Sequence, residues 1–404
     1  MKETKRLYFD DPYQVEFQAK IVQKEQKNSR TVVVLDQTCF YPESGGQPPD
    51  KGTLENKEVI HVYEQEGKIY HVLEDDIAAG RVKGKLDWET RLDHIQQHAG
   101  QHILSQSFYK ICGGETLSFR LGRTSSTIDL GLNQIPDDRM DRVERLANQI
   151  VFQDRKIRTY FMDKDEVQNI PLRKPPPQKG RIRVVEIEGF DYSPCGGTHP
   201  RRTGEIGLIK VVNRERVKKN LRVEFLCGGR AREDYAQKNS TLNQLTQLFS
   251  VKAPQLISSV EKLFLDLKSQ KKRSEKLQKK LVQYEADKIV REAPEKIIQR
   301  VFGERGPQEL RNLALNIIKK DEFVVLFGLK TPERAHVVLA CSENLSLDMR
   351  ELIPVISPLI QGKGGGRPSL VELAGEEREG LKTALDEAYS FIKKKFPPDS
   401  LNQK

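Results

Sequence analysis

The segment from residue 88 to residue 110 reads Trp88-Glu-Thr-Arg-Leu-Asp-His-Ile-Gln-Gln-His-Ala-Gly-Gln-His-Ile-Leu-Ser-Gln-Ser-Phe-Tyr-Lys110. Its apolar and histidine positions recur at steps of three and four, which predicts one long helix with a broad buried face. Gly113 and Gly114 follow and are expected to end the helix. Positions i and i+4 lie one above the other on a helix, so His98 and His102 can direct both imidazoles at one point. The helix therefore carries half of a candidate metal site.

A second pair of metal-binding side chains lies downstream, in Asp191-Tyr-Ser-Pro-Cys-Gly-Gly-Thr-His199. The proline and the two glycines predict a tight turn that brings Cys195 and His199 together. Three imidazoles and one thiolate suit Zn²⁺, so we expect one zinc ion per chain, held by His98, His102, Cys195 and His199. The alternative is that packed histidines and a buried thiol bind nothing. Four suitable ligands in two paired motifs, among only 7 His and 5 Cys, favour the metal.

The role of that ion stays open from the residues alone. Four protein ligands are typical of a structural site, whereas catalytic zinc sites keep one position free. We favour a catalytic role, in which the ion keeps room for water or the substrate and an ester is attacked at neutral pH. The cysteines are scattered and odd in number, which argues against a disulfide framework.

A glycine loop is the second candidate for function. It reads Thr38-Cys-Phe-Tyr-Pro-Glu-Ser-Gly-Gly-Gln-Pro-Pro-Asp50. Gly45 and Gly46 would admit a ligand close to the backbone, and Gln47 offers both a donor and an acceptor. The alternative is a plain hairpin loop.

Composition limits the class of protein. The 404 residues are 37% hydrophobic and 31% charged, which is enough to build cores and excludes a disordered chain. The net charge of +10 suggests a polyanionic partner. No apolar run approaches the ~18 residues that a membrane span needs. The first residues also lack an apolar signal core, so we expect a cytoplasmic protein with no membrane partner.

The order of the patterns predicts an α+β chain of four parts. Short β-rich runs split by turn residues indicate a β-barrel-like N-terminal domain at 1–87. Residues 88–240 mix helix and strand patterns, residues 241–305 read as a helical, coiled-coil-like linker, and residues 306–404 read as a C-terminal α/β domain. In that last part, helices are expected at 348–360 and 376–395.

The linker carries a basic heptad pattern. Residues 251–300 hold 13 Lys or Arg against 7 Asp or Glu, which is more than half of the chain's net charge. Apolar side chains on alternating steps of three and four predict a long helix or a helical hairpin; they are Leu256, Val260, Leu263, Leu267, Leu277, Leu281 and Tyr284. A seam between two chains and a hairpin within one chain fit this pattern equally well.

Two basic segments are candidate nucleic-acid contacts. The proline-rich stretch 173–183 contains no acid and carries Arg173, Lys174, Lys179, Arg181 and Arg183. The segment Gly362-Lys-Gly-Gly-Gly-Arg-Pro368 lacks the Walker A order and predicts a flexible loop. Its groups for phosphates or a base edge are the cations of Lys363 and Arg367 and the amides of Gly364, Gly365 and Gly366. Solvated loops are the alternative for both segments.

Together these motifs resemble the alanyl-tRNA editing family, and most of all its long free-standing form. That form is similar to the editing domain plus the C-terminal domain of alanyl-tRNA synthetase. The resemblance spans nearly the whole chain and rests on Thr38–Gln47, Gln97-His-Ala-Gly-Gln-His-Ile-Leu-Ser105, Ser126-Thr-Ile-Asp129, Cys195-Gly-Gly-Thr-His199, Arg222-Val-Glu-Phe-Leu-Cys-Gly-Gly-Arg-Ala231 and 362–368. Arg120 is a departure, because similar proteins are expected to carry His at that position.

The resemblance implies that 88–240 is a zinc-dependent editing domain that hydrolyses mischarged tRNA(Ala), chiefly Ser-tRNA(Ala) and also Gly-tRNA(Ala), while sparing Ala-tRNA(Ala). It implies catalytic roles for His98, His102 and Gln47. It implies that Thr38 meets the serine hydroxyl, in a pocket shared with Gly45, Gly46 and Gln47. The C-terminal domain would bind tRNA and support a homodimer.

Other interpretations remain. Editing domains of threonyl-tRNA synthetases carry a similar set of His and Cys and also remove serine, although the two glycine segments favour the alanyl type. A non-catalytic, zinc-containing RNA-binding protein would need the same ligands. A phosphoesterase is suggested only by the C-terminal domain, and Asp93-His94 is not followed by the second His such enzymes use.

Overall fold

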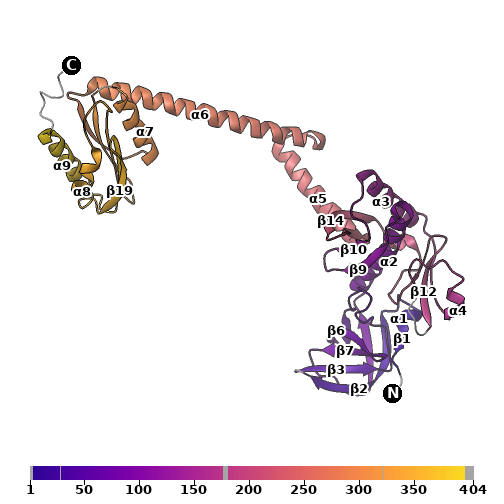
Figure 1. Cartoon of the computed structure of the whole chain (residues 1–404). Helices are drawn as coiled ribbons and strands as arrows, with labels where there is room; N and C mark the ends of the chain where they lie inside the picture. Colours follow the sequence, from indigo (N-terminus) through magenta and orange to yellow (C-terminus); the bar gives the residue numbers. More distant parts are fainter. Residues whose placement is uncertain (1–2, 28, 176–180, 321, 396–404) are drawn as a thin grey trace. The chain divides into compact units, whose positions relative to one another are not determined.

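The computed structural model describes residues 3–27, 29–175, 181–320 and 322–395 (Figure 1). Helices and strands alternate along them, and the predicted α+β class is confirmed. The chain divides into two compact units, residues 1–248 and 249–404. The histidines and the thiol of the candidate metal site belong to the first unit, and the glycine segment at 362–367 belongs to the second.

The first unit begins with a closed barrel of antiparallel strands. In order around the barrel they are β2 (Glu16–Lys27), β3 (Arg30–Leu35), β7 (Lys68–Leu73), β6 (Lys57–Gln65), β5 (Gly52–Leu54) and β8 (Arg81–Leu86). Buried and exposed side chains alternate along β8, as the two-residue period of a strand requires. The barrel core includes Phe17, Val33, Leu54, Ile69 and Leu73. Beside it, β1 (Lys5–Arg6) pairs in parallel with β4 (Gln37–Thr38), and α1 (Leu7–Asp10) follows β1.

Helix α2 (Trp88–Cys112) follows the barrel and confirms the predicted long helix. Asp87 caps its start, because its carboxylate accepts hydrogen bonds from the backbone N–H groups of Glu89 and Thr90. Gly113 ends it in the left-handed conformation, which glycine adopts without steric strain. Both ends of the predicted helix were therefore readable from local chemistry.

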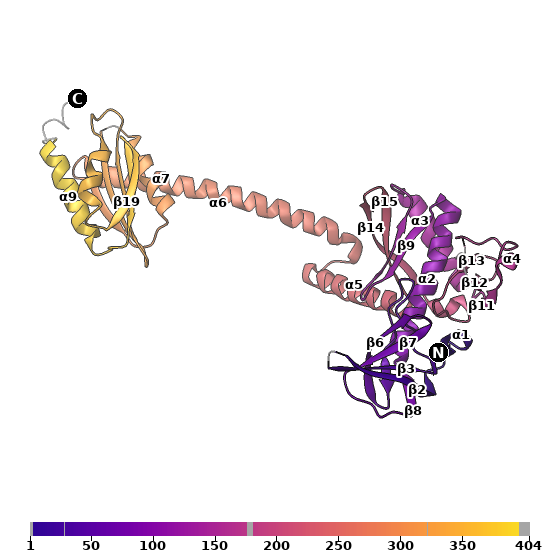
Figure 2. The ribbon, with the colours of Figure 1, turned by 60° about the horizontal axis from the view of Figure 1, so that its bottom comes forward.

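Two sheets pack with α2 in the first unit. One has the strand order β14 (Ile209–Val217), β15 (Asn220–Cys227), β10 (Ser126–Leu130) and β9 (Thr116–Leu121). The other consists of β11 (Ile157–Met162), β12 (Ile182–Ile187) and β13 (Asp191–Pro194). Helix α3 (Asp137–Phe152) lies beside α2 (Figure 2), and one core joins both helices to the sheets. The short α4 (Lys164–Val167) precedes β12, and α5 (Gly228–Phe249) follows β15.

The second unit contains α6 (Leu256–Glu292), which is a single uninterrupted helix. The prediction of a long helix is confirmed, and no hairpin turn forms within it. Ala293 leaves the helical conformation just before Pro294, which disfavours helix at the residue preceding it. Several side chains of the heptad pattern stay between 48% and 65% exposed, namely Leu263, Leu267, Leu277, Leu281 and Tyr284. Nothing in the described part of the chain covers this stripe.

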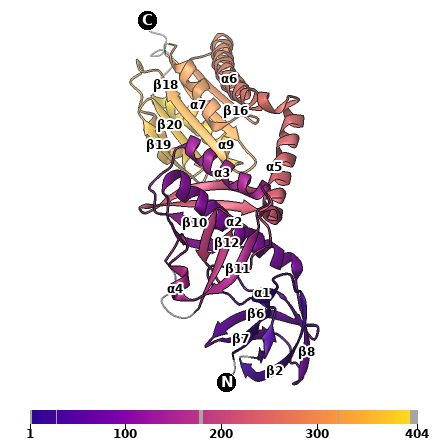
Figure 3. The ribbon, with the colours of Figure 1, turned by 90° about the vertical axis from the view of Figure 1, so that its right-hand side faces the viewer.

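The second unit also contains a five-stranded sheet. Its order is β16 (Ile297–Phe302), β17 (Val324–Lys330), β18 (Ala335–Cys341), β20 (Leu370–Gly375) and β19 (Gly362–Arg367). Alternate residues of β17 face opposite sides of the sheet. Val325 and Phe327 join the core made with α7 (Pro307–Ile318), whereas Val324 and Leu326 join the core made with α9 (Gly380–Lys395) (Figure 3).

The prediction of a flexible loop at 362–367 is wrong, because this segment is the edge strand β19, paired antiparallel with β20. The glycines are needed for the close approach of the two backbones. A Cβ at Gly364 would lie 2.0 Å from the carbonyl oxygen of Glu372, and one at Gly366 would lie 2.0 Å from that of Leu370. Of Gly364, Gly365 and Gly366, only Gly365 has open space where a Cβ would lie.

The helix expected at 348–360 is also wrong. Only a 3₁₀ turn at Met349–Leu352 and the four-residue helix α8 (Ile353–Ile356) form there. Pro358 lacks the N–H group that would continue the helix, so α8 ends before it. The helix expected at 376–395 is α9, which begins later, at Gly380.

Candidate metal centre

Helix α2 places the two histidines of the first motif together. The rings of His98 and His102 are stacked with their centroids 5.3 Å apart, as expected for neighbours one turn apart. Both side chains are buried, because this face of α2 packs into the first unit. The helix thus presents two imidazoles side by side inside the protein.

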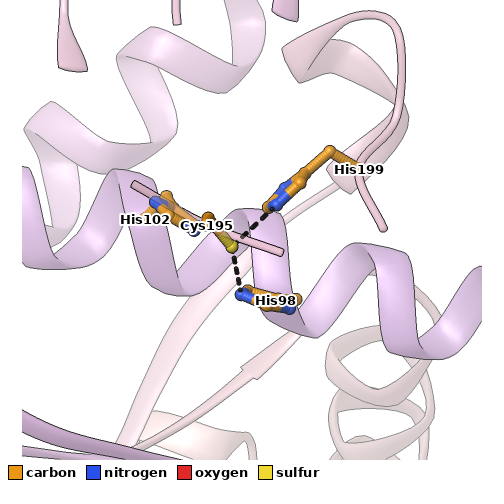
Figure 4. A group of neighbouring side chains, drawn as sticks. All are labelled: His98, His102, Cys195 and His199. Atoms are coloured by element: carbon orange, nitrogen blue, oxygen red, sulfur yellow. Dashed lines mark hydrogen bonds between the residues drawn. The ribbon is translucent and has the colours of Figure 1, made fainter. Parts of the chain in front are cut away.

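The turn after β13 brings the other two ligands to the same point. The Sγ atom of Cys195 lies 3.3 Å from Nε2 of His98 and 3.3 Å from Nε2 of His199 (Figure 4). Gly197 has to be glycine, since a Cβ there would lie 2.2 Å from Cε1 of His98. One ligand atom from each of His98, His102, Cys195 and His199 lies within 4.8 Å of all the others. This cluster could hold a metal ion.

The amide of Gln47 sets the tautomer of His98. Its Oε1 atom lies 2.7 Å from Nδ1 of His98 and also accepts a hydrogen bond from the backbone N–H of Thr198, at 3.4 Å. A backbone N–H can only donate, so the Gln47 atom facing both groups is the oxygen. Nδ1 of His98 therefore carries the proton, and Nε2 is left bare toward the cluster.

His102 has polar neighbours at one ring nitrogen only. Oδ2 of Asp191 and Nη2 of Arg173 both lie 3.5 Å from its Nδ1 atom. Nε2 of His102 is buried and has no hydrogen-bond partner among the described residues. Such an atom is costly unless something binds it, and a metal ion beside it would do so. The donor set and this orphaned atom both fit a metal ion.

The protonation states of Cys195 and His199 suit metal binding as well. Burial opposes charge on the Cys195 thiol, but the neighbouring imidazoles of His98, His199 and His102 prevail and hold its pKa well below the usual value. Burial lowers the pKa of His199 to about 3, which leaves a neutral imidazole. Thiolate and neutral imidazole are the forms that coordinate metals.

Arg183 stabilises the turn that carries Cys195, a role that the sequence did not indicate. Its Nη1 atom donates to the carbonyl oxygens of Cys195 and Gly197, both at 2.9 Å. The guanidinium also lies over the ring of Phe9, 4.7 Å from the centroid. The sequence places Arg183 in a basic stretch that is a candidate nucleic-acid contact, yet its side chain is buried and hydrogen-bonds the turn that carries Cys195.

Arg173 likewise does not face solvent, so its assignment as a tRNA contact is corrected. Only 6% of its side chain is exposed, and its Nε atom lies 3.0 Å from the buried carboxylate of Asp191. It also donates to Oγ of Ser193 at 3.0 Å. Asp191 was missed because a single acid in a turn motif carries no pattern of its own; its partners come from distant segments.

The glycine loop lies against strand β9. Gly46 has a φ of +83°, and a Cβ there would lie 2.5 Å from the carbonyl oxygen of Phe119. Its own carbonyl accepts a hydrogen bond from the N–H of Leu121 at 2.9 Å. Close packing therefore explains Gly46, whereas Gly45 has open space around it. Gln47 is fully buried and its Nε2 donates to Oγ1 of Thr198 at 3.0 Å, so both ends of its amide are engaged.

Thr38 opens the same loop and is fully buried. Its Oγ1 atom lies 2.9 Å from Nε2 of His71 and accepts a hydrogen bond from the N–H of Phe40 at 3.1 Å. His71, on β7 of the barrel, carries no recognisable motif in the sequence, so its contact with Thr38 could be found only in the fold.

Arg120 lies on β9 between two residues that face inward. The ring of Phe119 lies 5.3 Å from that of His98, and side chains alternate along a strand. Arg120 pairs with Thr127 across the sheet and is exposed. It stands on the face of the sheet opposite to the metal ligands.

The remaining basic candidates are distributed over both units. Arg181 is 66% exposed, pairs with Asp163 at 3.4 Å and lies over the ring of Phe161. Lys174 is exposed, and partial desolvation lowers its pKa. Lys179 lies outside the described residues. In the second unit, Lys363 and Arg367 are exposed on the edge strand β19.

Over the described residues, none of the helices has the length and apolar character of a membrane span.

The class of protein follows from matches to known families. Residues 182–223 match the threonyl and alanyl tRNA synthetase second additional domain, and residues 3–90 match class II (A) tRNA synthetases. The alanyl-tRNA editing protein AlaX-L of Pyrococcus horikoshii is 31% identical over 407 residues, which cover 96% of this chain and 99% of that protein. The chain belongs to the alanyl-tRNA editing protein family.

Full-length synthetases match the same region. The alanine–tRNA ligase of Methanococcus maripaludis is 33% identical over 417 residues, which cover 98% of this chain but 44% of the ligase. The chain thus spans less than half the length of the ligases it matches. Among solved structures, the C-Ala domain of Aquifex aeolicus alanyl-tRNA synthetase is 23% identical, with a TM-score of 0.23, over 25% of this chain and 93% of the domain.

Proposed function

We propose that this protein is a hydrolase that removes serine from mischarged tRNA(Ala) in trans, removes glycine more weakly, and spares Ala-tRNA(Ala). The observation that carries the proposal is the cluster of His98, His102, Cys195 and His199, whose ligand atoms lie within 4.8 Å of one another. It occurs in a chain that matches nearly all of an alanyl-tRNA editing protein.

We infer that the cluster holds one zinc ion. Three imidazole nitrogens and a thiolate form the borderline-soft set that zinc prefers over harder cations. When bound, zinc would supply a Lewis acid for hydrolysis of the ester. The chain's own groups would hold the ligands in position: Gln47 accepts a hydrogen bond from Nδ1 of His98, and Asp191 lies beside Nδ1 of His102. These contacts support positioning of His98 by Gln47 rather than contact between Gln47 and the substrate.

Selection among acyl groups would rest on Thr38. A site that hydrogen-bonds a substrate hydroxyl can reject an analogue without it by ~10⁴–10⁵. Alanine lacks that hydroxyl and would be spared. Glycine also lacks it, so its removal should be slower than that of serine.

The tRNA itself would be held by exposed cations in both units. Arg181 is available near the metal centre, and Lys363 and Arg367 flank the glycines of β19. Gly364, Gly365 and Gly366 form an edge strand that lacks side chains, so a nucleic acid could approach its backbone closely. Binding of this kind weakens steeply with salt. A homodimer through the second unit would cover the exposed stripe of α6.

Deacylation assays test the proposal directly. Ser-tRNA(Ala), Gly-tRNA(Ala) and Ala-tRNA(Ala) are each incubated with the protein, with and without prior removal of metal by a chelator. We expect serine to be released fastest, alanine to stay attached, and chelation to stop the reaction until zinc is restored. Ser-tRNA(Thr) is included because the matched domain type occurs in threonyl synthetases as well. Preferential hydrolysis of Ser-tRNA(Thr) would indicate a threonyl-type enzyme, and binding of tRNA without hydrolysis would leave a non-catalytic RNA-binding protein.

A further inference from the structure

The hydroxyl group of Thr38 contacts a fully buried histidine of the barrel, His71. Nε2 of His71 lies 2.9 Å from Oγ1 of Thr38. The other ring nitrogen, Nδ1, lies 3.4 Å from the backbone carbonyl oxygen of Val33. The ring also packs edge-on against Phe40, with the centroids 5.4 Å apart. His71 therefore has a polar contact at each nitrogen and no exposure to water.

These contacts decide which nitrogen carries the proton. The carbonyl oxygen of Val33 can only accept, so Nδ1 of His71 is the donor. Burial lowers the pKa of His71 to about 4, so the ring is neutral near pH 7 and has a single N–H. Nε2 is consequently bare and can only accept.

The proton of the Thr38 hydroxyl is therefore not available to a ligand. It is donated to Nε2 of His71, while the backbone N–H of Phe40 occupies one lone pair of the oxygen, at 3.1 Å. A hydroxyl has one proton and two lone pairs, so one lone pair remains. We propose that His71 is a positioning residue that makes Thr38 an obligate acceptor, so that Thr38 selects acyl groups carrying a hydrogen-bond donor on the side chain.

This inference rests on the proposed function and deepens it. The serine side chain has such a donor in its hydroxyl, whereas those of alanine and glycine have none. Had His71 the opposite tautomer, Thr38 would instead point its proton at the ligand and would favour acceptors. His71 would thus decide whether Thr38 donates or accepts toward the substrate without touching the substrate. The tautomer of His71 is set in turn by the backbone carbonyl of Val33.

A double-mutant cycle tests the coupling between the two residues. Activity is measured as kcat and KM on Ser-tRNA(Ala) and Gly-tRNA(Ala), in the full chain loaded with zinc. We expect His71→Phe to lower kcat/KM for Ser-tRNA(Ala) by about tenfold, which corresponds to one ordinary hydrogen bond, and to leave kcat/KM for Gly-tRNA(Ala) unchanged. In a Thr38→Val background the same substitution should change the serine rate by less than about twofold. His71→Gln, whose amide oxygen can replace Nε2 as an acceptor, should recover most of the loss.

A purely structural histidine would behave differently. Equal losses of kcat/KM for both substrates, or the same loss with and without the Thr38 hydroxyl, would overturn the proposal. A second measurement does not depend on activity. Nitrogen-15 NMR of histidine-labelled protein should show His71 as the Nδ1–H tautomer, with its signals assigned by their absence in His71→Gln. An Nε2–H tautomer would refute the proposal even if Ser-tRNA(Ala) is hydrolysed, whereas absent hydrolysis with the Nδ1–H tautomer would refute the proposed function instead.

Discussion

Oε1 of Gln47 lies 2.7 Å from Nδ1 of His98, although the two residues are 51 positions apart in the chain. The first belongs to a loop of the barrel region and the second to helix α2. This one contact joins the glycine loop to the candidate metal cluster. It favours a role for Gln47 in orienting His98 over contact with the substrate.

Gln47→Ala should therefore weaken metal binding. Loss of a group that orients a metal ligand typically costs 10–100-fold in affinity. Zinc affinity is measured by competition with a chromophoric chelator, in the wild type and the variant. Gln18→Ala, at an exposed position on β2, is the matched control and should leave the affinity unchanged.

Substitution of Cys195 by Ala should lower the zinc content of the purified protein below one ion per chain, because the only thiolate of the cluster is removed. Elemental analysis by plasma mass spectrometry measures this. Cys112→Ala removes a half-buried thiol that is outside the cluster and should leave the zinc content unchanged. Full occupancy in Cys195→Ala would contradict the ligand assignment.

Asp191→Leu should destabilise the first unit as well as the metal site. It leaves Arg173 buried without a carboxylate, and breaking a buried ion pair in this way costs about 3–5 kcal/mol. The chain has a single tryptophan, Trp88 at the start of α2, so its fluorescence in urea follows unfolding of the first unit. The double variant Asp191→Leu/Arg173→Met removes both charges and should recover much of the free energy of unfolding. If the double variant is no more stable than Asp191→Leu, the ion pair is not the cause.

The neutral state of His71 predicts a dependence of stability on pH. Burial lowers the pKa of His71 to about 4, below its ordinary value of 6.5, so the unfolded chain binds more protons between these pH values. The contribution of His71 is fully present above pH 6.5 and is lost as the pH falls toward 4, by about 2.5 kcal/mol at pH 4.5. Urea unfolding at pH 7 and pH 4.5 should show this excess loss in the wild type relative to His71→Phe. Identical pH dependence in both proteins would mean that His71 is not held neutral.

Substitution by alanine should destabilise β19 at Gly364 but not at the neighbouring Gly365. Gly364→Ala places a Cβ against the backbone of β20 and should cost about 1–3 kcal/mol, whereas Gly365→Ala meets open space. Amide hydrogen exchange over residues 362–375 measures the local effect, with faster exchange expected only in Gly364→Ala. Equal exchange in both variants would show that β19 does not pair closely with β20.

Much of the fold was predictable because its signals are local. The capping residue Asp87, the helical spacing of α2 and the terminating Gly113 all lie within one stretch of chain. The incorrect predictions arose where the same residue type is compatible with two different structures. The glycines at 362–367 predicted flexibility, and instead they allow two strands to approach. The helix expected at 348–360 follows the apolar pattern, but Pro358 removes a backbone donor.

The sequence by itself determined which four side chains can form the candidate metal cluster, since the two members of each pair are four residues apart, on one helix or in one short turn. Only the tertiary structure decided what surrounds them. The cluster is surrounded by contacts between separate segments, such as those of Gln47 with His98 and of Asp191 with His102. The contact between His71 and Thr38 likewise joins separate segments. A charged or polar residue reads as solvent-exposed until the fold encloses it, because burial and hydrogen-bond partners are properties of packing rather than of local sequence.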